Sequence, residues 1–473
     1  MIDAIPSLRG LTDDEQATLA KLWQQWLRKQ PKNMLLDVYY DTKRAFQDLG
    51  ISIPPQMSKT SAALGWPSKA VQALARKHVF EGYTLSGSMD PFEMGDLLEE
   101  NLFEIELVQA ISSAYKHSCS FLTVTKGGEG EPDVLIQARD AEWSTAIWDK
   151  RRREISSALA ITDTDDLGNP TAATMFLRDD TIHLRADRGA WSMERLGNLT
   201  GRVLVEPLTY DPQLNRPFGH SRITREVRYL TDAAVRTLVR TETSAEFFSS
   251  PQRWAMGVDE EAFKNTDRWT AIMGRLLALE VNEEGNAPTV GQFPQLSMDP
   301  HLSMYRQLAQ NFCAATGLPQ SSVGLFADNP ASAEAMQAAE VNLSDEADYQ
   351  WRIFRGPLRR VLQDVMMVRD NLTEPPVESW KLGVKWTPTR YVSPQAASDS
   401  IVKIVQAIPK VADTTVALRR ANFTTEEIEE MQAEWRAARG SDLLDRAMGR
   451  VQPSQEVTTS GLSGADGGVP AGE

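Results

Sequence analysis

The sequence of 473 residues is poor in cysteine and histidine and has no long hydrophobic run. Its two cysteines, Cys119 and Cys313, are too few for a scaffold held by disulfides or for a cysteine-rich zinc module. We expect both to be buried thiols in a reducing compartment. The five histidines never fall at the spacing of a metal-binding pair, so the sequence predicts no metal site.

Membrane and export signals are also missing. No run approaches the roughly 18 apolar residues that a membrane span needs. The chain does not open with a basic segment followed by an apolar stretch, which is the pattern of a signal peptide. We therefore expect a protein that is made inside the cell and has no membrane partner.

Catalytic signatures are equally scarce. The chain has no phosphate-binding G-x-x-x-x-G-K-[ST] loop, and the glycines at 127–130 predict a hairpin turn. Residues 219–221 lack the last glycine of a nucleophile elbow and indicate a helix cap instead. Residues 163–168 begin like a calcium loop, but Thr174 stands where a bidentate glutamate is needed, which favours a polar turn. We therefore predict no catalytic residue, no cofactor and no bound metal.

The charge balance excludes one way of handling nucleic acid. The chain has 65 Asp and Glu against 50 Lys and Arg, which gives a net charge of −15. Its overall field is therefore not suited to holding a polyanion. This net charge is compatible with a local row of basic residues, and also with a role in which DNA moves past the protein without binding tightly.

Hydrophobic periodicity predicts a helical start, a β-rich middle and a helical second half. The start comprises two helices over 11–49 with an N-terminal cap at Thr12, a helix from Ser68, and a helix over about 91–116. Short β-branched runs over 121–207 predict an antiparallel β layer. A long helix that reaches Ser250 is expected next, followed by a compact insert over 251–299. Within the insert we expect strands at 253–258 and 276–281, a helix at 260–273 and a closing loop. The elements expected after the insert are helices at 301–316 and 331–370, a strand at 381–386, and helices at 394–408, 411–420 and 424–439.

The helix after residue 219 has two distinct faces. At 100° per residue one face is apolar, with Ile223, Val227, Leu230, Ala234 and Leu238. The opposite face carries a row of arginines at 222, 225, 228, 236 and 240. This row is either a solvated or salt-bridged face between subunits, or a wall that faces a polyanion.

Four stretches, at 64–83, 216–257, 317–343 and 384–406, give the chain a likeness to a known family. Two long helices bracket a small insert and are followed by a loop and a kinked helix. In this order the sequence resembles the portal proteins of tailed double-stranded DNA bacteriophages, in the branch that infects actinobacteria. The resemblance extends over most of the chain.

The resemblance implies an α+β, mostly helical portal fold that assembles as a ring. It assigns the segments as follows: wing at 1–218, first stem helix at 219–250, clip at 251–299, second stem helix at 300–317, tunnel loop at 318–330, kinked helix and wing strand at 331–392, crown helices at 393–449, and a disordered tail at 450–473.

The resemblance also implies function and partners. Portal proteins form rings, usually of twelve copies, at one capsid vertex of the virion, where double-stranded DNA passes through the channel. The implied partners are the terminase motor, the major capsid protein and a head–tail adaptor, and no enzymatic activity is expected. Two alternatives stay open: a DNA-processing enzyme with an unrecognised carboxylate site, and a structural shell or tail subunit.

The candidate site residues fall in three places. In the tunnel loop we expect Gln320, Ser321, Ser322, Val323, Gly324, Leu325, Asp328 and Asn329 to face DNA. On the stem, the candidate basic face consists of Arg225, Arg228, Arg236 and Arg240. Gly356 and Pro357 should bend the long helix, because proline lacks an N–H and clashes with the preceding turn.

Overall fold

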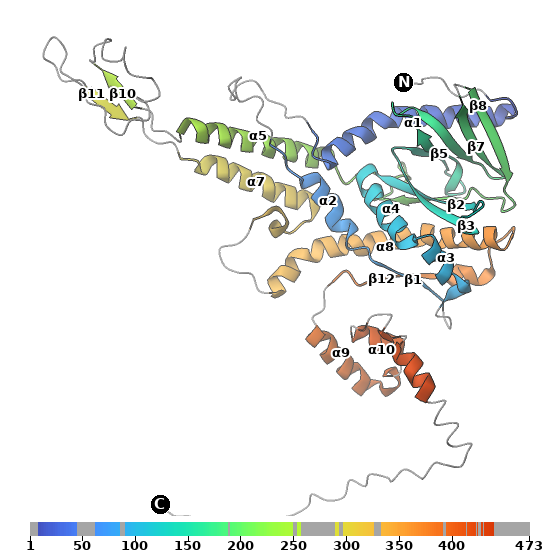
Figure 1. The fold of residues 1–473 in the computed structure, drawn as a ribbon. Coiled ribbons are helices and arrows are strands. Elements are labelled where there is room, and N and C mark those ends of the chain that lie inside the picture. Colours follow the sequence, from blue (N-terminus) through green and yellow to red (C-terminus); the bar gives the residue numbers. More distant parts are fainter. Residues whose placement is uncertain are drawn as a thin grey trace, which may run out of the picture. The chain divides into compact units, whose positions relative to one another are not determined.

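The structure is a computed structural model of the whole chain. It describes residues 8–44, 62–85, 90–187, 190–248, 253–256, 289–292, 297–325, 333–390, 394–412, 414–421, 423, 427–428 and 430–438. The chain divides into two compact units, Met1–Arg390 and Tyr391–Glu473. Helices and antiparallel sheets share the first unit (Figure 1), which confirms the predicted α+β, mostly helical class. Among the described helices, none is both long and apolar enough to cross a membrane.

The N-terminal helix α1 runs from Asp13 to Tyr40. Its predicted cap is confirmed: the Thr12 hydroxyl accepts a hydrogen bond from the Glu15 N–H, and the Glu15 carboxylate accepts one from the Thr12 N–H. The sequence analysis expected two helices over 11–49, and the described part, which ends at residue 44, contains one helix that continues through Pro31. Contacts with the sheets hold the helix on both sides of that proline.

The predicted helix over 91–116 is divided into several elements. The helices of this region are α2 (Trp66–Ala75), the 3₁₀ turn η2 (Pro91–Glu93), α3 (Gly95–Glu100) and α4 (Phe103–His117). The break between α3 and α4 lies at Leu102, whose φ of 49° is left-handed and cannot continue a helix. Phe103 and Leu107 then face the core.

Two antiparallel sheets confirm the predicted β layer. The smaller has the order β3–β2–β9, and the larger is a meander from β4 to β8. Their strands are β2 (Cys119–Lys126), β3 (Val134–Asp140), β4 (Ser144–Asp149), β5 (Glu154–Thr164), β6 (Pro170–Phe176), β7 (Asp180–Asp187), β8 (Ala190–Gly197) and β9 (Val205–Thr209). The turn at 127–130 joins β2 to β3, and the Asp165 carboxylate stabilises the turn between β5 and β6, as expected of a hairpin and a polar turn.

Helix α1 covers the larger sheet. Leu19, Leu22, Trp23 and Trp26 of α1 are buried against Leu159, Ile161, Met175, Ile182 and Leu184 of the strands. A second, larger core joins α2, α4 and the smaller sheet to α8 (Ala333–Arg369). The two cores give the first unit its layered construction.

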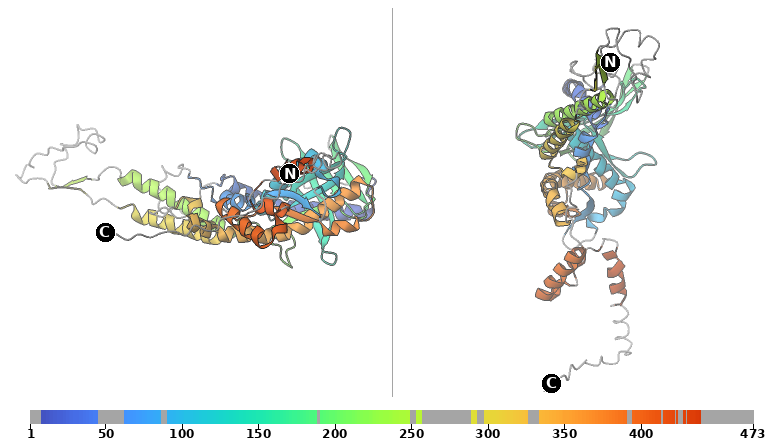
Figure 2. Two further views of the ribbon diagram at one scale, coloured as in Figure 1. Left: turned by 90° about the horizontal axis from the view of Figure 1, so that it is seen from below. Right: turned by 90° about the vertical axis from the view of Figure 1, so that its left-hand side faces the viewer.

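Two long helices, α5 (Arg225–Phe248) and α7 (Asp299–Thr316), confirm the predicted helical pair around the insert. They lie side by side in all three views (Figures 1 and 2). Within the insert, β10 (Arg253–Met256) pairs with β11 (Thr289–Gln292). The strand at β11 corrects the sequence analysis, which placed a loop there, and the helix at 260–273 and strand at 276–281 lie outside the described residues.

After α7 the chain forms the 3₁₀ turn η4 (Gln320–Val323) and then α8. The predicted strand at 381–386 is confirmed as β12 (Gly383–Trp386), which follows the 3₁₀ turn η5 (Val377–Lys381). Its partner is β1 (Phe80–Thr84), which the sequence analysis missed. This pairing connects the N-terminal part of the unit to its last elements.

The described elements of the second unit are helical. They are α9 (Pro394–Ala407), the 3₁₀ turn η6 (Pro409–Val411), α10 (Thr415–Arg420) and a helical stretch at 430–438. The helix predicted over 411–420 begins only at Thr415, where the Thr414 side chain accepts a hydrogen bond from the Ala417 N–H. The tail predicted to be disordered, 450–473, lies outside the described residues.

Candidate functional site

The two long helices α5 and α7 contact each other, and each buries side chains in the subunit. Thr231, Thr237 and Thr243 are buried on α5, and each hydroxyl donates to the carbonyl oxygen four residues earlier. Their hydroxyl donors are therefore satisfied within the helix, which permits their burial. On α7, Phe312 is fully buried and stacks on Trp66 of α2, with ring centroids 4.8 Å apart.

The arginines of the candidate basic face of α5 are only partly exposed to solvent. Arg225 is exposed, while Arg228, Arg236 and Arg240 are half-buried. The guanidinium of Arg228 lies 5.9 Å from the centre of the Tyr39 ring on α1. Tyr39 also donates a hydrogen bond of 2.7 Å to Asp232, so the middle of α5 is attached to α1. Which of these arginines faces DNA stays a prediction.

Arg222 does not belong to that face, which corrects the sequence analysis. It precedes α5, is only 4% exposed, and points into the body of the subunit. Its Nε donates to the Ala70 oxygen over 2.6 Å, and its Nη2 donates to the Thr316 oxygen over 2.5 Å. Its Nη1 forms an ion pair with Glu346 of α8.

Tyr210 completes this buried network. Its hydroxyl donates to Glu346 over 2.6 Å and accepts a hydrogen bond from Arg222 over 3.2 Å. Burial raises the pKa of Tyr210, so the hydroxyl stays protonated and can donate. One arginine therefore joins the start of α5, the end of α7, α2 and α8. Sequence reasoning missed this junction, because the four elements are distant along the chain.

The first half of the predicted tunnel loop is packed against the subunit. Gln320 and Ser321 are exposed, Ser322 is half-buried, and the Ser322 oxygen accepts a hydrogen bond of 2.7 Å from Lys69. Val323 is buried in the main core and Leu325 packs against that core.

Val323 is therefore withdrawn as a residue that faces DNA, because a buried side chain cannot face a lumen. Gly324 is exposed and has a left-handed φ of 82°, which glycine adopts without strain. Asp328 and Asn329 lie outside the described residues. A contact between this segment and DNA stays a prediction.

The long helix α8 continues through Gly356 and Pro357 without a break. Phe354 and Leu358, on either side of this pair, are fully buried, and the Leu358 oxygen accepts a hydrogen bond of 2.9 Å from Tyr83. Tertiary contacts therefore hold the helix where proline weakens it. The predicted bend stays a prediction.

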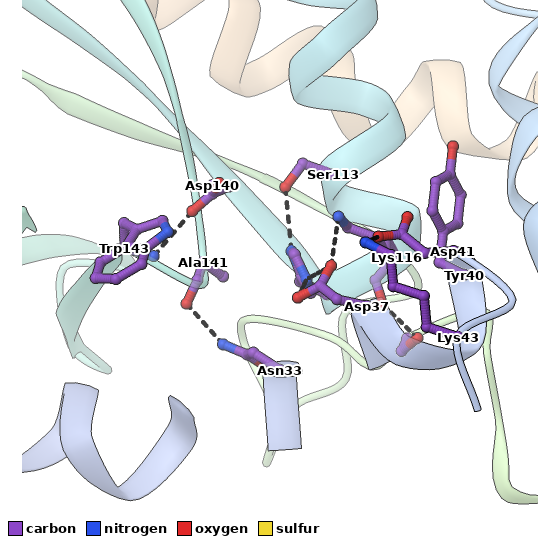
Figure 3. Close-up of polar contacts among 12 residues, drawn as sticks. Asn33, Asp37, Tyr40, Asp41, Lys43, Ser113, Lys116, Asp140, Ala141 and Trp143 are labelled. Carbon is purple, nitrogen blue, oxygen red and sulfur yellow. Dashed lines mark hydrogen bonds and ion pairs between the residues drawn. The ribbon is translucent and has the colours of Figure 1, made fainter. Parts of the chain in front are cut away.

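One group of side chains in the described residues has the composition of a metal site. Asp37, His117 and Glu142 offer ligand atoms that lie within 4.8 Å of one another. However, the Lys116 ammonium lies 2.5 Å from Asp37 (Figure 3). His117 Nε2 lies 2.9 Å from the same carboxylate. The lysine thus already supplies a positive charge to the carboxylates, which makes this a partly buried ion cluster rather than a cation site.

Burial, hydrogen bonds and neighbouring charges set the protonation of the two carboxyl groups in this cluster. Burial alone raises the pKa of Asp37, but hydrogen bonds from His117 and Lys116 outweigh it and leave that pKa below its usual value. Burial raises the pKa of Glu142 to about 7, and the negative charge of Asp37 contributes to the rise. Near neutral pH the cluster therefore holds one ionised and one partly protonated carboxyl group.

Comparison with known proteins places this arrangement in a class. Residues 19–441 match the family described as "Phage portal protein, SPP1 Gp6-like". Since the match covers most of the sequence, the chain belongs to this family of phage portal proteins. This confirms the resemblance seen in the sequence.

Two relatives come from phages of an actinobacterial host. The portal protein of Mycobacterium phage L5 is 28% identical over 422 residues, which is 86% of either chain. The portal protein of Mycobacterium phage D29 is 27% identical over the same length and coverage. The predicted branch is thereby confirmed.

Solved structures show a weaker similarity. "Virion of native gene transfer agent (GTA) particle" matches with a TM-score of 0.42 and 11% identity, over 80% of this chain and 96% of that one. "Neck of native GTA particle computed with C12 symmetry" matches with a TM-score of 0.42 and 12% identity, over 85% and 97%. At these values neither structure supports an inference about this chain.

Proposed function

We propose that this chain is one subunit of a ring of about twelve copies at one vertex of the capsid. Double-stranded DNA enters and leaves the virion through the central channel. The match to the portal family over residues 19–441 carries this proposal. The terminase motor drives the DNA, the major capsid protein surrounds the ring, and a head–tail adaptor binds it. The portal itself acts without catalysis.

The charge of the chain suits a conduit. Each phosphate that a Lys or Arg neutralises strengthens binding, and a ring repeats every such contact. Twelve chains of net charge −15 carry −180 together, which forms a repulsive background for DNA. The arginines of α5 then supply a few attractive contacts without holding the cargo. The family match favours this role over a DNA-processing enzyme or a shell subunit.

The contacts of Arg222 fix the two long helices to the rest of the subunit, which suits a channel protein. A channel that carries moving DNA needs its long helices fixed to the rest of the subunit. The buried network of Arg222, Glu346 and Tyr210 supplies such a junction at the start of α5 and the end of α7.

The experiment is complementation. In a phage that carries this gene, deletion of the gene should abolish nuclease-protected DNA in particles, and expression of the chain in trans should restore it. Protected DNA at normal levels in the deletion strain would contradict the proposal. Empty but complete heads in that strain would point to a role after head assembly.

A further inference from the structure

A cavity of about 430 Å³ lies between α1, the junction of α4 with β2, the first residues of β4, and the loop before α5. Its lining contains these residues: Gln25, Lys29, Lys32, Asn33, His117, Ser118, Cys119, Phe121, Ala141, Ser144, Thr145, Ala146, Asn215, Arg216, Pro217, Phe218, Gly219 and His220. A cavity of this size is large enough for a small organic molecule.

The lining is basic in an acidic protein. It contains Lys29, Lys32 and Arg216 and no aspartate or glutamate, although the chain has 65 acidic residues against 50 basic ones. All three cations are exposed. Among the described residues, none of their side chains has a hydrogen-bond or ion-pair partner. The lining therefore gathers three positive charges that no carboxylate of the described residues neutralises.

The cations also lie close enough to disfavour one another. The surrounding protein desolvates Lys32 and lowers its pKa, and the positive charges of Lys29, Arg216 and Arg228 lower it further. Like charges held together in this way cost stability in the free protein. An anion placed among them would remove that cost.

The interior of the cavity offers hydrogen-bond donors. Ser144 is 6% exposed, lines the cavity, and its hydroxyl has no hydrogen-bond partner. A buried polar group without a partner is costly, and a ligand is one way to satisfy it. The Nδ1 atom of His220 is likewise buried without a partner.

Two carboxylates contact histidines of the lining. Asp37 binds His117 at 2.9 Å and Asp211 binds His220 at 3.2 Å, and neither carboxylate lines the cavity itself. They orient the two imidazoles while leaving the cavity free of negative charge.

We propose that this cavity binds a phosphate group, carried by a molecule of about mononucleotide size. Phosphate accepts several hydrogen bonds at once, and Arg and Lys are its usual partners in proteins. Lys29, Lys32 and Arg216 supply the charge at the rim, and Ser144 supplies a donor inside. The phosphate comes either from a free nucleotide or from the end or backbone of a nucleic acid. The proposal is independent of the channel function.

The test uses the full chain and isothermal titration at constant ionic strength. The three probes are inorganic phosphate, a mononucleotide and a short DNA duplex, each compared with sodium chloride. Lys32→Glu should weaken phosphate binding by about tenfold or more, because a charge-assisted contact becomes a repulsion. Ser144→Ala, which removes a hydroxyl that bonds nothing in the free protein, should weaken it by about threefold.

Lys150→Glu is the matched control. Lys150 is an exposed lysine in the turn between β4 and β5, outside the lining, and its replacement should leave the affinity unchanged. Lys32→Glu should also raise the melting temperature of the free protein, since it relieves repulsion, while it abolishes stabilisation by phosphate. This pair of effects separates a binding site from a fold defect.

The three probes distinguish a free phosphate ligand from a nucleic acid. Binding of phosphate or the mononucleotide that Lys32→Glu abolishes supports a free ligand. Binding of the duplex alone, lost in Lys32→Glu and kept in Lys150→Glu, supports a nucleic acid. Absence of binding for all three probes, or equal losses in Lys32→Glu and Lys150→Glu, would overturn the proposal.

Discussion

The Nη2 atom of Arg222 donates a hydrogen bond of 2.5 Å to the main-chain oxygen of Thr316. This bond links the residue that lies just before α5 to the last residue of α7, although the insert with β10 and β11 separates the two helices in the sequence. The same side chain pairs with Glu346 of α8. The two long helices therefore share one buried anchor in the body of the subunit.

Removal of this anchor should be costly. Arg222→Ala leaves Glu346 and the Thr316 oxygen without their partner, and we expect a loss of about 3–5 kcal/mol in the free energy of unfolding. Urea denaturation measures it. The control is Arg390→Ala, because the pair of Arg390 with Asp345 is exposed and should contribute at most about 1 kcal/mol. Equal losses in the two variants would contradict the role of Arg222.

Two substitutions in the segment after α7, one at a buried and one at an exposed residue, should have different effects on stability and on DNA packaging. Val323→Ala removes buried carbon and should cost about 2 kcal/mol of stability. Gln320→Ala changes an exposed side chain and should alter stability by less than about 0.5 kcal/mol. If the segment contacts DNA, Gln320→Ala changes the rate of packaging in complemented phage. A large loss of stability in Gln320→Ala would show that this turn is buried in the assembled ring.

The basic residues of α5 distinguish a channel wall from a subunit contact. Reversal of charge in Arg236→Glu with Arg240→Glu places repulsion toward DNA on every copy in the ring. A channel wall predicts intact rings with reduced DNA content, measured by electron microscopy and by nuclease-protected DNA. Failure of ring formation would instead assign these arginines to ion pairs between subunits.

Glu142 should make stability depend on pH. Its pKa rises from 4.5 in the unfolded chain to about 7 in the folded one, so the folded state favours the protonated form. The stabilisation from this group is complete below about pH 4.5 and is lost as the pH rises through 7. Because Glu142 is only half-buried, we expect about 1–2 kcal/mol.

Thermal or urea unfolding between pH 5 and pH 8 measures this dependence. The glutamine in Glu142→Gln stays neutral at every pH. Between pH 5 and pH 8 this variant should therefore lose less stability than the wild type, by about 1–2 kcal/mol. Glu104→Gln, at an exposed position of α4, serves as the control and should leave the pH profile unchanged. A wild-type profile in Glu142→Gln would show that another group titrates.

Gly356 tests whether α8 must bend or flex. A Cβ atom added at Gly356 would meet no other atom within 4 Å, so alanine fits. Gly356→Ala should stabilise the helix by about 0.5–1 kcal/mol, since glycine costs more backbone entropy than alanine. If the bend is used during DNA passage, the variant packages less DNA despite its higher stability. Normal packaging would leave Gly356 without a functional role.

Periodicity predicted the long elements well and their local exceptions poorly. The α5 and α7 helices and the β layer have strong patterns that tertiary contacts reinforce. Proline weakens the interior of a helix, yet α1 continues through Pro31. The Asn33 amide donates to the Ala141 oxygen over 2.6 Å and the Trp26 indole donates to the Glu142 oxygen over 2.7 Å, so α1 is held on both sides of the proline. Local propensity cannot register such contacts.

The candidate site was predicted less completely, for two physical reasons. Arg222 was placed on a helical face by counting at 100° per residue, but α5 begins at Arg225, so that projection does not apply to it. The basic cavity draws its lining from α1, β4 and the loop before α5, which only the fold brings together. The sequence signal for it was limited to two lysines three residues apart, at 29 and 32.

Ring formation is the central claim, and end-on electron-microscope images of the purified chain test it most directly. Rotational symmetry is counted in those views, and the mass of the particle is compared with the 52.7 kDa of one chain. Rings of about twelve copies with an open centre are the expected result. A uniform population of compact monomers or dimers, unchanged when capsid and scaffold proteins are present, would contradict the assignment as a DNA channel.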